Sequence, residues 1–188
     1  MNPAKTPRVL FSAETLQERI NQIGRQISRD YAGLELIMVS VLKGSLYFMA
    51  DLTRAIDLPV QLDFMTIGTF AHTTSRTGIV RITKDLDLDI TNRHVLVIED
   101  IIRTGLTTGY LVQNLETRKP ASVKVCSLFV NPEQQLINVP IAYTGFVVSY
   151  NRLVGYGMDV NEQGRNLPYI VEIDKTENWS WPAGIQNS

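Results

Sequence analysis

Cysteine is nearly absent from this sequence: Cys126 is the only one among 188 residues. A single thiol excludes an internal disulfide framework and is typical of proteins from a reducing compartment. Cys126 lies in the apolar run 123–130. Because free cysteines behave as small apolar residues in protein cores, we interpret it as a buried strand residue and not as a nucleophile.

Long apolar runs and an excess of charge are lacking as well. No apolar stretch approaches the roughly 18 residues that a membrane-spanning helix needs, and residues 1–7 lack the apolar core of a signal peptide. The charges almost cancel, with 18 Lys and Arg against 19 Asp and Glu. Such a balance gives no electrostatic reason to bind nucleic acid or a membrane surface. We therefore expect a cytoplasmic protein with neither of these partners.

Repeats, low-complexity blocks and linkers are missing too, so we expect a single domain over residues 1–188. Apolar residues at helical spacing predict a helix that Ser12 caps and two more helices near 45–56 and 107–117. The polar stretch Thr69–Thr77 predicts a mobile loop. Short apolar runs predict strands at 36–41, 60–67, 95–98, 123–130, 141–148 and 170–173, with 79–82 completing a β-ribbon.

Strands that alternate with helices imply right-handed βαβ units and an α/β fold with a mostly parallel sheet. Ligands bind at the carboxyl ends of such strands. At one of these ends the buried strand 95–98 is followed by Glu99 and Asp100, and then by the turn Arg103–Thr107 at a helix start. Backbone N–H groups and hydroxyls in such a turn can hold a phosphate, and the two carboxylates suit ribose hydroxyls or hydrated Mg²⁺. The alternative is an acidic strand end with a solvated turn.

This segment resembles the phosphoribosyl pyrophosphate (PRPP) motif of the type I phosphoribosyltransferases. From about residue 8 to 174 the chain resembles the bacterial hypoxanthine-guanine phosphoribosyltransferases. The stretches that carry this resemblance are 41–44, 62–65, 99–102, 154–159 and 164–168. It implies a central, mostly parallel five-stranded sheet flanked by helices, a core over about 30–140, and a small hood formed by the N-terminal segment and about 141–175. It also implies a homodimer or homotetramer.

The resemblance implies roles on the phosphoribosyl side, with PRPP and Mg²⁺ as ligands. Glu99 and Asp100 match residues that hold ribose hydroxyls and metal, and Asp159 matches one that organises a second Mg²⁺ beside the base. Arg165 matches an arginine that contacts pyrophosphate through a charge-assisted fork. Residues that match the pyrophosphate loop, with its cis peptide bond before the lysine, are Leu42, Lys43 and Gly44. Residues that match the 5′-phosphate loop are Arg103, Thr104, Gly105, Leu106 and Thr107. For Lys43, Asp159 and Arg165, ordinary surface charges are the alternative reading.

On the base side the sequence departs from the family. Arg103 stands where the purine enzymes have an aspartate that handles the N7 proton as acid or base. Asn131 replaces a lysine that donates to the purine 6-oxo group. Arg152, next to Leu153 at the base-binding position, replaces a stacking aromatic residue.

The mobile closing loop also differs, since Thr69 and Phe70 replace its usual Ser-Tyr pair.

Arginine cannot act as a general base at neutral pH, and acid-base assistance is worth about 10² to 10⁴ in rate. Exchanging a negative for a positive charge about 5 Å from a cationic ribosyl centre costs roughly 6 kcal/mol at an effective dielectric constant near 20. Three functions therefore stay open: a 6-oxopurine phosphoribosyltransferase that tolerates these changes, a phosphoribosyltransferase for a non-purine or acidic acceptor, and a non-catalytic PRPP- or nucleotide-binding regulatory protein.

Overall fold

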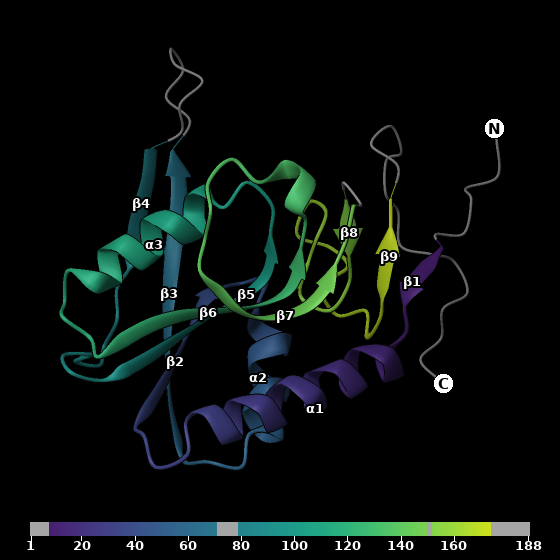
Figure 1. Cartoon of the computed structure of the whole chain (residues 1–188). Coiled ribbons are helices and arrows are strands. Elements are labelled where there is room, and N and C mark those ends of the chain that lie inside the picture. Colours follow the sequence, from purple (N-terminus) through teal and green to yellow (C-terminus); the bar gives the residue numbers. More distant parts are fainter. Residues whose placement is uncertain (1–7, 71–78, 150–151, 174–188) are drawn as a thin grey trace, which may run out of the picture.

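The computed structural model describes residues 8–70, 79–149 and 152–173, and these residues form two sheets and three α-helices (Figure 1). The larger sheet has the order β4-β3-β2-β5-β6-β7. Its strands are β2 (Leu36–Leu42), β3 (Val60–Phe70), β4 (Ile79–Lys84), β5 (His94–Ile102), β6 (Ser122–Val130) and β7 (Ile141–Val147). The helices are α1 (Ala13–Asp30), α2 (Leu46–Ala55) and α3 (Leu106–Glu116), with the 3₁₀ turn η1 (Pro132–Gln134) after β6.

The central strands are buried on both faces, which explains their uninterrupted apolar sequence. Successive side chains of a strand point to opposite faces. In β5, Leu96 and Ile98 pack in the core under α1 and α2, whereas Val95 and Val97 pack in a second core under α3. Cys126 of β6 is fully buried in the first of these cores, as its apolar surroundings predicted.

Helix α1 begins where the sequence predicted it. The Ser12 side chain accepts a hydrogen bond from the Thr15 N–H at 3.3 Å, which satisfies a free donor of the first turn. The apolar stripe of the helix is buried, and its members are Leu16, Ile20, Ile23 and Ile27. Gly24 lets α2 approach closely, because a β-carbon at this position would lie 2.5 Å from the Ala55 carbonyl oxygen.

The smaller sheet forms the hood, in the order β1-β9-β8, from β1 (Val9–Phe11), β8 (Leu153–Val154) and β9 (Ile170–Glu172). It joins the N-terminal segment to the region after β7, as expected. The family resemblance predicts that the hood begins near residue 141. Instead, β7 pairs in parallel with β6 as the edge strand of the main sheet. The main sheet therefore has six strands and not five, of which β4 is antiparallel.

The β3-β4 ribbon was also expected, but it is longer than the sequence indicated. Thr69 and Phe70, which were assigned to the mobile loop, are strand residues whose backbones pair with Val80 and Ile79. The rest of that loop, 71–77, lies outside the described residues. Among the described helices, none is long and apolar enough to cross a membrane.

Candidate active site

The two acids that resemble part of the PRPP motif, Glu99 and Asp100, lie within β5 itself, which continues to Ile102. Glu99 is buried and accepts a hydrogen bond from the Thr108 hydroxyl of α3 at 3.0 Å. Burial and the neighbouring negative charge of Asp100 raise the pKa of Glu99 to about 8, although the hydrogen bond from Thr108 opposes this shift. Without a bound cation, Glu99 is therefore largely protonated at neutral pH.

Asp100 is half-buried, and its Oδ1 accepts the Ile101 N–H at 2.8 Å. Burial raises the pKa of Asp100, while this backbone hydrogen bond and the positive charges of Arg103 and Arg165 act in the opposite direction. The carboxylate lies against Gly44, where an added β-carbon would come within 2.0 Å of Oδ2. The end of β5 thus touches the loop that follows β2.

A cavity of about 230 Å³ lies between the end of β5 and the start of α3. It is lined by Glu99, Ile101, Ile102, Arg103, Thr104, Gly105, Thr107 and Thr108. The first N–H groups of α3 have no carbonyl partner within the helix, so they offer donors and a positive dipole end to an anion. Gly105, the residue before α3, has a φ of 78°, a left-handed conformation that favours glycine.

The segment that follows η1 holds the turn before α3 in place through backbone contacts. The Thr104 carbonyl oxygen accepts N–H groups from Leu136 at 3.0 Å and Ile137 at 3.4 Å. A β-carbon on Gly105 would lie 3.0 Å from the Ile137 carbonyl oxygen. The expected 5′-phosphate loop is therefore held on both sides, by its own helix and by the chain after β6.

The loop after β2 contains a cis peptide bond between Leu42 and Lys43, as the family resemblance implied. Two buried serines that the sequence analysis did not single out fix this turn. The Ser45 hydroxyl donates to the Val41 carbonyl oxygen at 2.6 Å, and the Ser40 and Ser45 hydroxyl oxygens lie 2.6 Å apart. The backbone of the expected pyrophosphate loop is thus fixed by side chains underneath it, while Lys43 itself is exposed.

The hood reaches the same loop through Gly157. Its φ is 99°, and a β-carbon there would come within 1.9 Å of the Gly44 carbonyl oxygen. Gly157 and Arg165 are joined twice, by the Gly157 N–H to the Arg165 carbonyl oxygen and by Arg165 Nη1 to the Gly157 carbonyl oxygen, both at 2.8 Å. Asp100, Gly44 and Gly157 therefore form a continuous line of contact from β5 to the hood.

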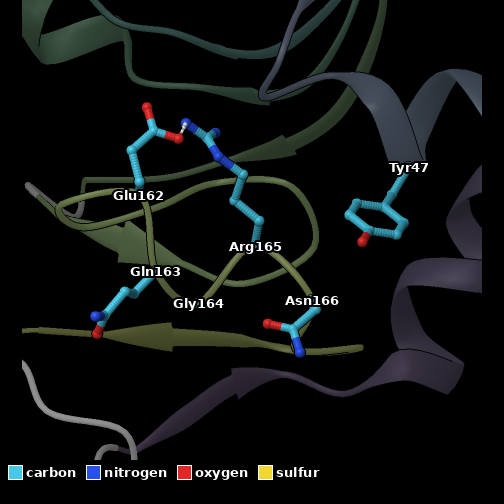
Figure 2. A pocket seen from close by; sticks show the side chains of 6 residues that line it. All are labelled: Tyr47, Glu162, Gln163, Gly164, Arg165 and Asn166. Atoms are coloured by element: carbon cyan, nitrogen blue, oxygen red, sulfur yellow. Dashed lines mark hydrogen bonds and ion pairs between the residues drawn. The ribbon is translucent and has the colours of Figure 1, made fainter.

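Four charged side chains meet above this contact. Arg165 Nη2 lies 2.8 Å from Asp159 Oδ1 and 3.2 Å from Glu162 Oε2, and Lys43 Nζ lies 3.0 Å from the same Glu162 oxygen. Figure 2 shows Arg165 and Glu162 side by side. Both residues line a pocket of about 420 Å³, to which Tyr47 contributes from α2. The sequence analysis identified Lys43, Asp159 and Arg165, but it missed Glu162.

Of the base-side residues, Asn131 follows β6, whereas Leu153 begins β8 and Arg152 directly precedes it. Asn131 is fully buried, and its N–H donates to the Ile102 carbonyl oxygen at 2.9 Å. Arg152 is half-buried, and its carbonyl oxygen accepts the Ile173 N–H at 3.0 Å; Leu153 beside it is buried. Within the described part of the chain, the cavity beside α3 is lined by Arg103 but not by these three residues.

Comparison with known proteins identifies the family. The model of the phosphoribosyl transferase domain matches residues 12–161. The chain belongs to this family.

Two hypoxanthine-guanine phosphoribosyltransferases are similar to this phosphoribosyltransferase-family chain over most of their own length. It is 44% identical over 178 residues to the hypoxanthine-guanine phosphoribosyltransferase of Mycobacterium tuberculosis, covering 92% of this chain and 88% of the relative. The enzyme of that name from Streptococcus pneumoniae is 40% identical over 163 residues, which cover 87% and 91% of the two chains.

Solved structures confirm the type I phosphoribosyltransferase fold. The hypoxanthine phosphoribosyltransferase of Staphylococcus aureus matches with a TM-score of 0.84 and 38% identity, covering 89% of this chain and 91% of that one. A hypoxanthine-guanine phosphoribosyltransferase of Bacillus anthracis matches with a TM-score of 0.84 and 40% identity, covering 89% and 98%.

The carboxylates of this family member could hold Mg²⁺ only together with a bound substrate. Among residues 8–70, 79–149 and 152–173, no group of three or more His, Cys, Asp or Glu side chains is arranged to hold a metal ion. Mg²⁺ keeps several waters and is commonly bound by one or two carboxylates together with substrate phosphates. Glu99 and Asp100 at the strand end, and Asp159 in the hood, offer such a partial set.

Proposed function

We propose that this protein transfers the 5-phosphoribosyl group of PRPP to a nitrogenous base and releases pyrophosphate, with hypoxanthine or guanine as the acceptor. The observation that carries the proposal is the contact line from Asp100 through Gly44 to Gly157, which joins the strand-end acids, the Lys43 loop and the hood. The similarity to hypoxanthine-guanine phosphoribosyltransferases over most of the chain supports the choice of acceptor.

In this proposal the phosphoribosyl half of PRPP lies along the end of β5. Thr104, Gly105 and Thr107 take the 5′-phosphate at the start of α3, where backbone donors and the helix dipole favour an anion. Asp100 and Glu99 accept hydrogen bonds from the ribose hydroxyls. The raised pKa of Glu99 means that its charged form develops when cationic or donor groups arrive.

The pyrophosphate half lies over the loop after β2. Lys43 offers a point charge from this loop, and Arg165 offers a guanidinium that the Gly157 carbonyl oxygen orients. Glu99, Asp100 and Asp159 are the residues that would hold Mg²⁺. The metal would neutralise charge on the leaving pyrophosphate.

In the transfer step, the bond between the ribose C1 and the pyrophosphate oxygen breaks, and a bond from a base nitrogen to C1 forms. A proton must leave the base nitrogen. Arg103 lines the cavity at the position where the family has its acid-base aspartate, and a guanidinium cannot accept this proton at neutral pH. We therefore expect purine transfer to proceed without side-chain base assistance, at a rate lower by about 10² to 10⁴.

The test is an assay of purified protein with PRPP, Mg²⁺ and either hypoxanthine or guanine. The proposal requires nucleoside monophosphate and pyrophosphate to form in equal amounts, and requires Asp100→Asn to abolish both. PRPP that binds but stays intact with both purines and with a pool of other metabolites would instead favour a non-catalytic binding protein.

One observation favours a second acceptor class, a base that carries a carboxylate. Arg103 Nε is shielded from solvent and has no hydrogen-bond partner among the described residues, although the side chain lines the cavity. A buried donor without a partner costs about 1–3 kcal/mol, which an acceptor carboxylate would relieve. The same assay with pyridine and pyrimidine carboxylates tests this candidate, and Arg103→Gln should abolish any such activity.

We also propose a homodimer or homotetramer in the cytoplasm, as the family resemblance implies. Light scattering on the purified protein measures the oligomeric state directly.

A further inference from the structure

Glu162 contacts both cations of the proposed pyrophosphate site with one oxygen. Its Oε2 lies 3.0 Å from Lys43 Nζ and 3.2 Å from Arg165 Nη2, and Figure 2 shows the contact with Arg165. Lys43 follows β2, whereas Glu162 and Arg165 belong to the hood, so this one carboxylate links two parts of the site that are 119 positions apart in the sequence.

The backbone presents Glu162 to these cations. Val160 and Gln163 exchange two backbone hydrogen bonds of 3.0 Å, which close a tight turn over the two residues between them. Both of these residues, Asn161 and Glu162, have left-handed φ angles of 52° and 63°. The Glu162 N–H donates to Asp159 Oδ2 at 2.9 Å, which fixes the turn further. Left-handed backbone is uncommon for residues other than glycine, so the position of the carboxylate follows from a specific turn.

The charges in this cluster cancel. Lys43 and Arg165 carry two positive charges, and Asp159 and Glu162 carry two negative ones. The hydrogen bonds from Lys43 and Arg165 lower the pKa of Glu162, so its carboxylate is charged at neutral pH. A polyanion that entered the unchanged cluster would meet no net positive charge. Removing Glu162 alone from the cluster would leave a net charge of +1 for the incoming anion.

We propose that Glu162 is an internal substitute for pyrophosphate: its carboxylate occupies Lys43 and Arg165 in the ligand-free protein and is displaced when PRPP or pyrophosphate binds. This inference rests on the proposed function. Displacement is easy because the Glu162 side chain is 65% exposed, as is that of Lys43, whereas Arg165 and Asp159 are only 23% and 28% exposed. The exposed Glu162 carboxylate can turn into solvent, while the more buried pair of Arg165 and Asp159 stays in place.

This role makes Glu162 a residue that weakens ligand binding. Displacing it costs the interaction of an exposed carboxylate with two cations, and exposed ion pairs are individually weak. Its removal should therefore tighten pyrophosphate and PRPP binding by a factor of about three to ten. If Glu162 instead served only to hold the hood turn in place, its removal would weaken pyrophosphate and PRPP binding, because the turn would loosen.

The experiment is isothermal titration calorimetry with inorganic pyrophosphate and Mg²⁺ on the wild type, Glu162→Gln and Glu35→Gln. Glu35 is a matched control: it is 76% exposed, pairs with Arg93 at 2.7 Å, and precedes β2 at the end opposite Lys43. We expect tighter pyrophosphate binding in Glu162→Gln and no change in Glu35→Gln. In the enzyme assay, the KM for PRPP should fall and product inhibition by pyrophosphate should increase.

A second variant covers the possibility that the glutamine disturbs the turn. Glu162→Asp keeps the charge but shortens its reach by one methylene, so it should also tighten pyrophosphate binding, although by less than Glu162→Gln. Pyrophosphate affinity that is unchanged or weakened in both variants, with wild-type melting temperatures, would overturn the inference and leave the proposed function intact. Tighter pyrophosphate binding without nucleotide formation from any base would support the inference and contradict the proposed function.

Discussion

The carboxylate of Asp100 lies so close to Gly44 that a β-carbon on Gly44 would approach Oδ2 to 2.0 Å. Glycine is needed at this position because the Asp100 side chain approaches so closely. The backbone conformation does not require it, since the φ of Gly44 is not in the left-handed region. A second glycine, Gly157, closes the other side of the loop with its φ of 99°. These two contacts set the separation of the strand-end acids, the Lys43 loop and the hood.

Gly44→Ala should impair ligand binding more than it impairs stability. The atom that the new methyl group meets is the end of a side chain, so Asp100 can move without unfolding the sheet. We expect a loss of about 1 kcal/mol or less in the free energy of unfolding, within the range of ordinary point substitutions. Mg²⁺-dependent PRPP affinity should fall at least about tenfold, since one charged ligand contact is worth about 1.5–3 kcal/mol. Calorimetry that shows wild-type PRPP affinity would refute this assignment of Asp100.

Gly157→Ala should instead destabilise the fold. Its β-carbon would meet a backbone oxygen at 1.9 Å, and the residue would also be held at a positive φ. Gly33→Ala is the control, because Gly33 has a φ of 76° with nothing within 4 Å of a β-carbon. We expect Gly33→Ala to lower the free energy of unfolding by about 1 kcal/mol, the strain of a positive φ alone. Gly157→Ala should lower it by more, roughly 3 kcal/mol. Chemical denaturation measures both, and equal losses would show that the Gly44 contact is not rigid.

Glu99 should make the metal-free protein less stable as pH rises. The unfolded chain ionises Glu99 near the ordinary pKa of 4.5, and the folded chain near 8. Between these values the folded state retains a proton that the unfolded state has lost, so the free energy of unfolding falls as pH increases. Relative to Glu99→Gln, the wild type should lose up to roughly 3–4 kcal/mol between pH 5 and pH 8.

Denaturation in the presence of a chelator measures this difference. Glu35→Gln, which removes an exposed carboxylate, should follow the wild-type pH profile. Parallel profiles for the wild type and Glu99→Gln would show that Glu99 is not held protonated.

Much of the fold could be predicted from the sequence, because buried parallel strands and an amphipathic helix leave strong apolar patterns. The run 123–130 and the Ser12 cap were placed correctly, and the run 95–98 marks the buried part of β5, which continues to Ile102. The membership of β7 in the main sheet was missed because edge strands carry fewer buried residues than central ones, so their sequence does not show where they pair.

The site was less completely predictable, for a related reason. Lys43, Asp159 and Arg165 were found through their match to the family. Glu162 was not found, because it lies outside the sequence stretches that carry the resemblance. Its significance depends on Lys43, 119 positions away, which only the folded chain brings within 3.0 Å. The buried pair Ser40 and Ser45, one in β2 and the other in the turn after it, was missed in the same way, because only the folded chain brings their hydroxyl groups together.

Asp159→Ala should remove most of the effect of Mg²⁺ on pyrophosphate binding. Without the metal, the charged cluster loses one negative charge, so pyrophosphate should bind as well as to the wild type or better. With Mg²⁺, a metal-organising carboxylate is missing, and the gain in affinity that the metal provides should largely disappear. Calorimetry at several Mg²⁺ concentrations tests this, and an undiminished metal effect would exclude Asp159 from the metal site.

The most direct test of the central claim is purine turnover by Arg103→Asp. If the chain is a purine phosphoribosyltransferase in which Arg103 has replaced the acid-base residue, this change should raise turnover of hypoxanthine or guanine at least about tenfold, although Asn131 and Arg152 still differ from the family. Arg103→Gln, which removes the charge without supplying a base, should gain less. The gain in Arg103→Asp should come with little change in PRPP affinity, because Thr104, Gly105 and Thr107 of the phosphate turn and the Asp100 side chain are all retained. Purine turnover that stays at the wild-type level in Arg103→Asp, while PRPP still binds, would contradict the account.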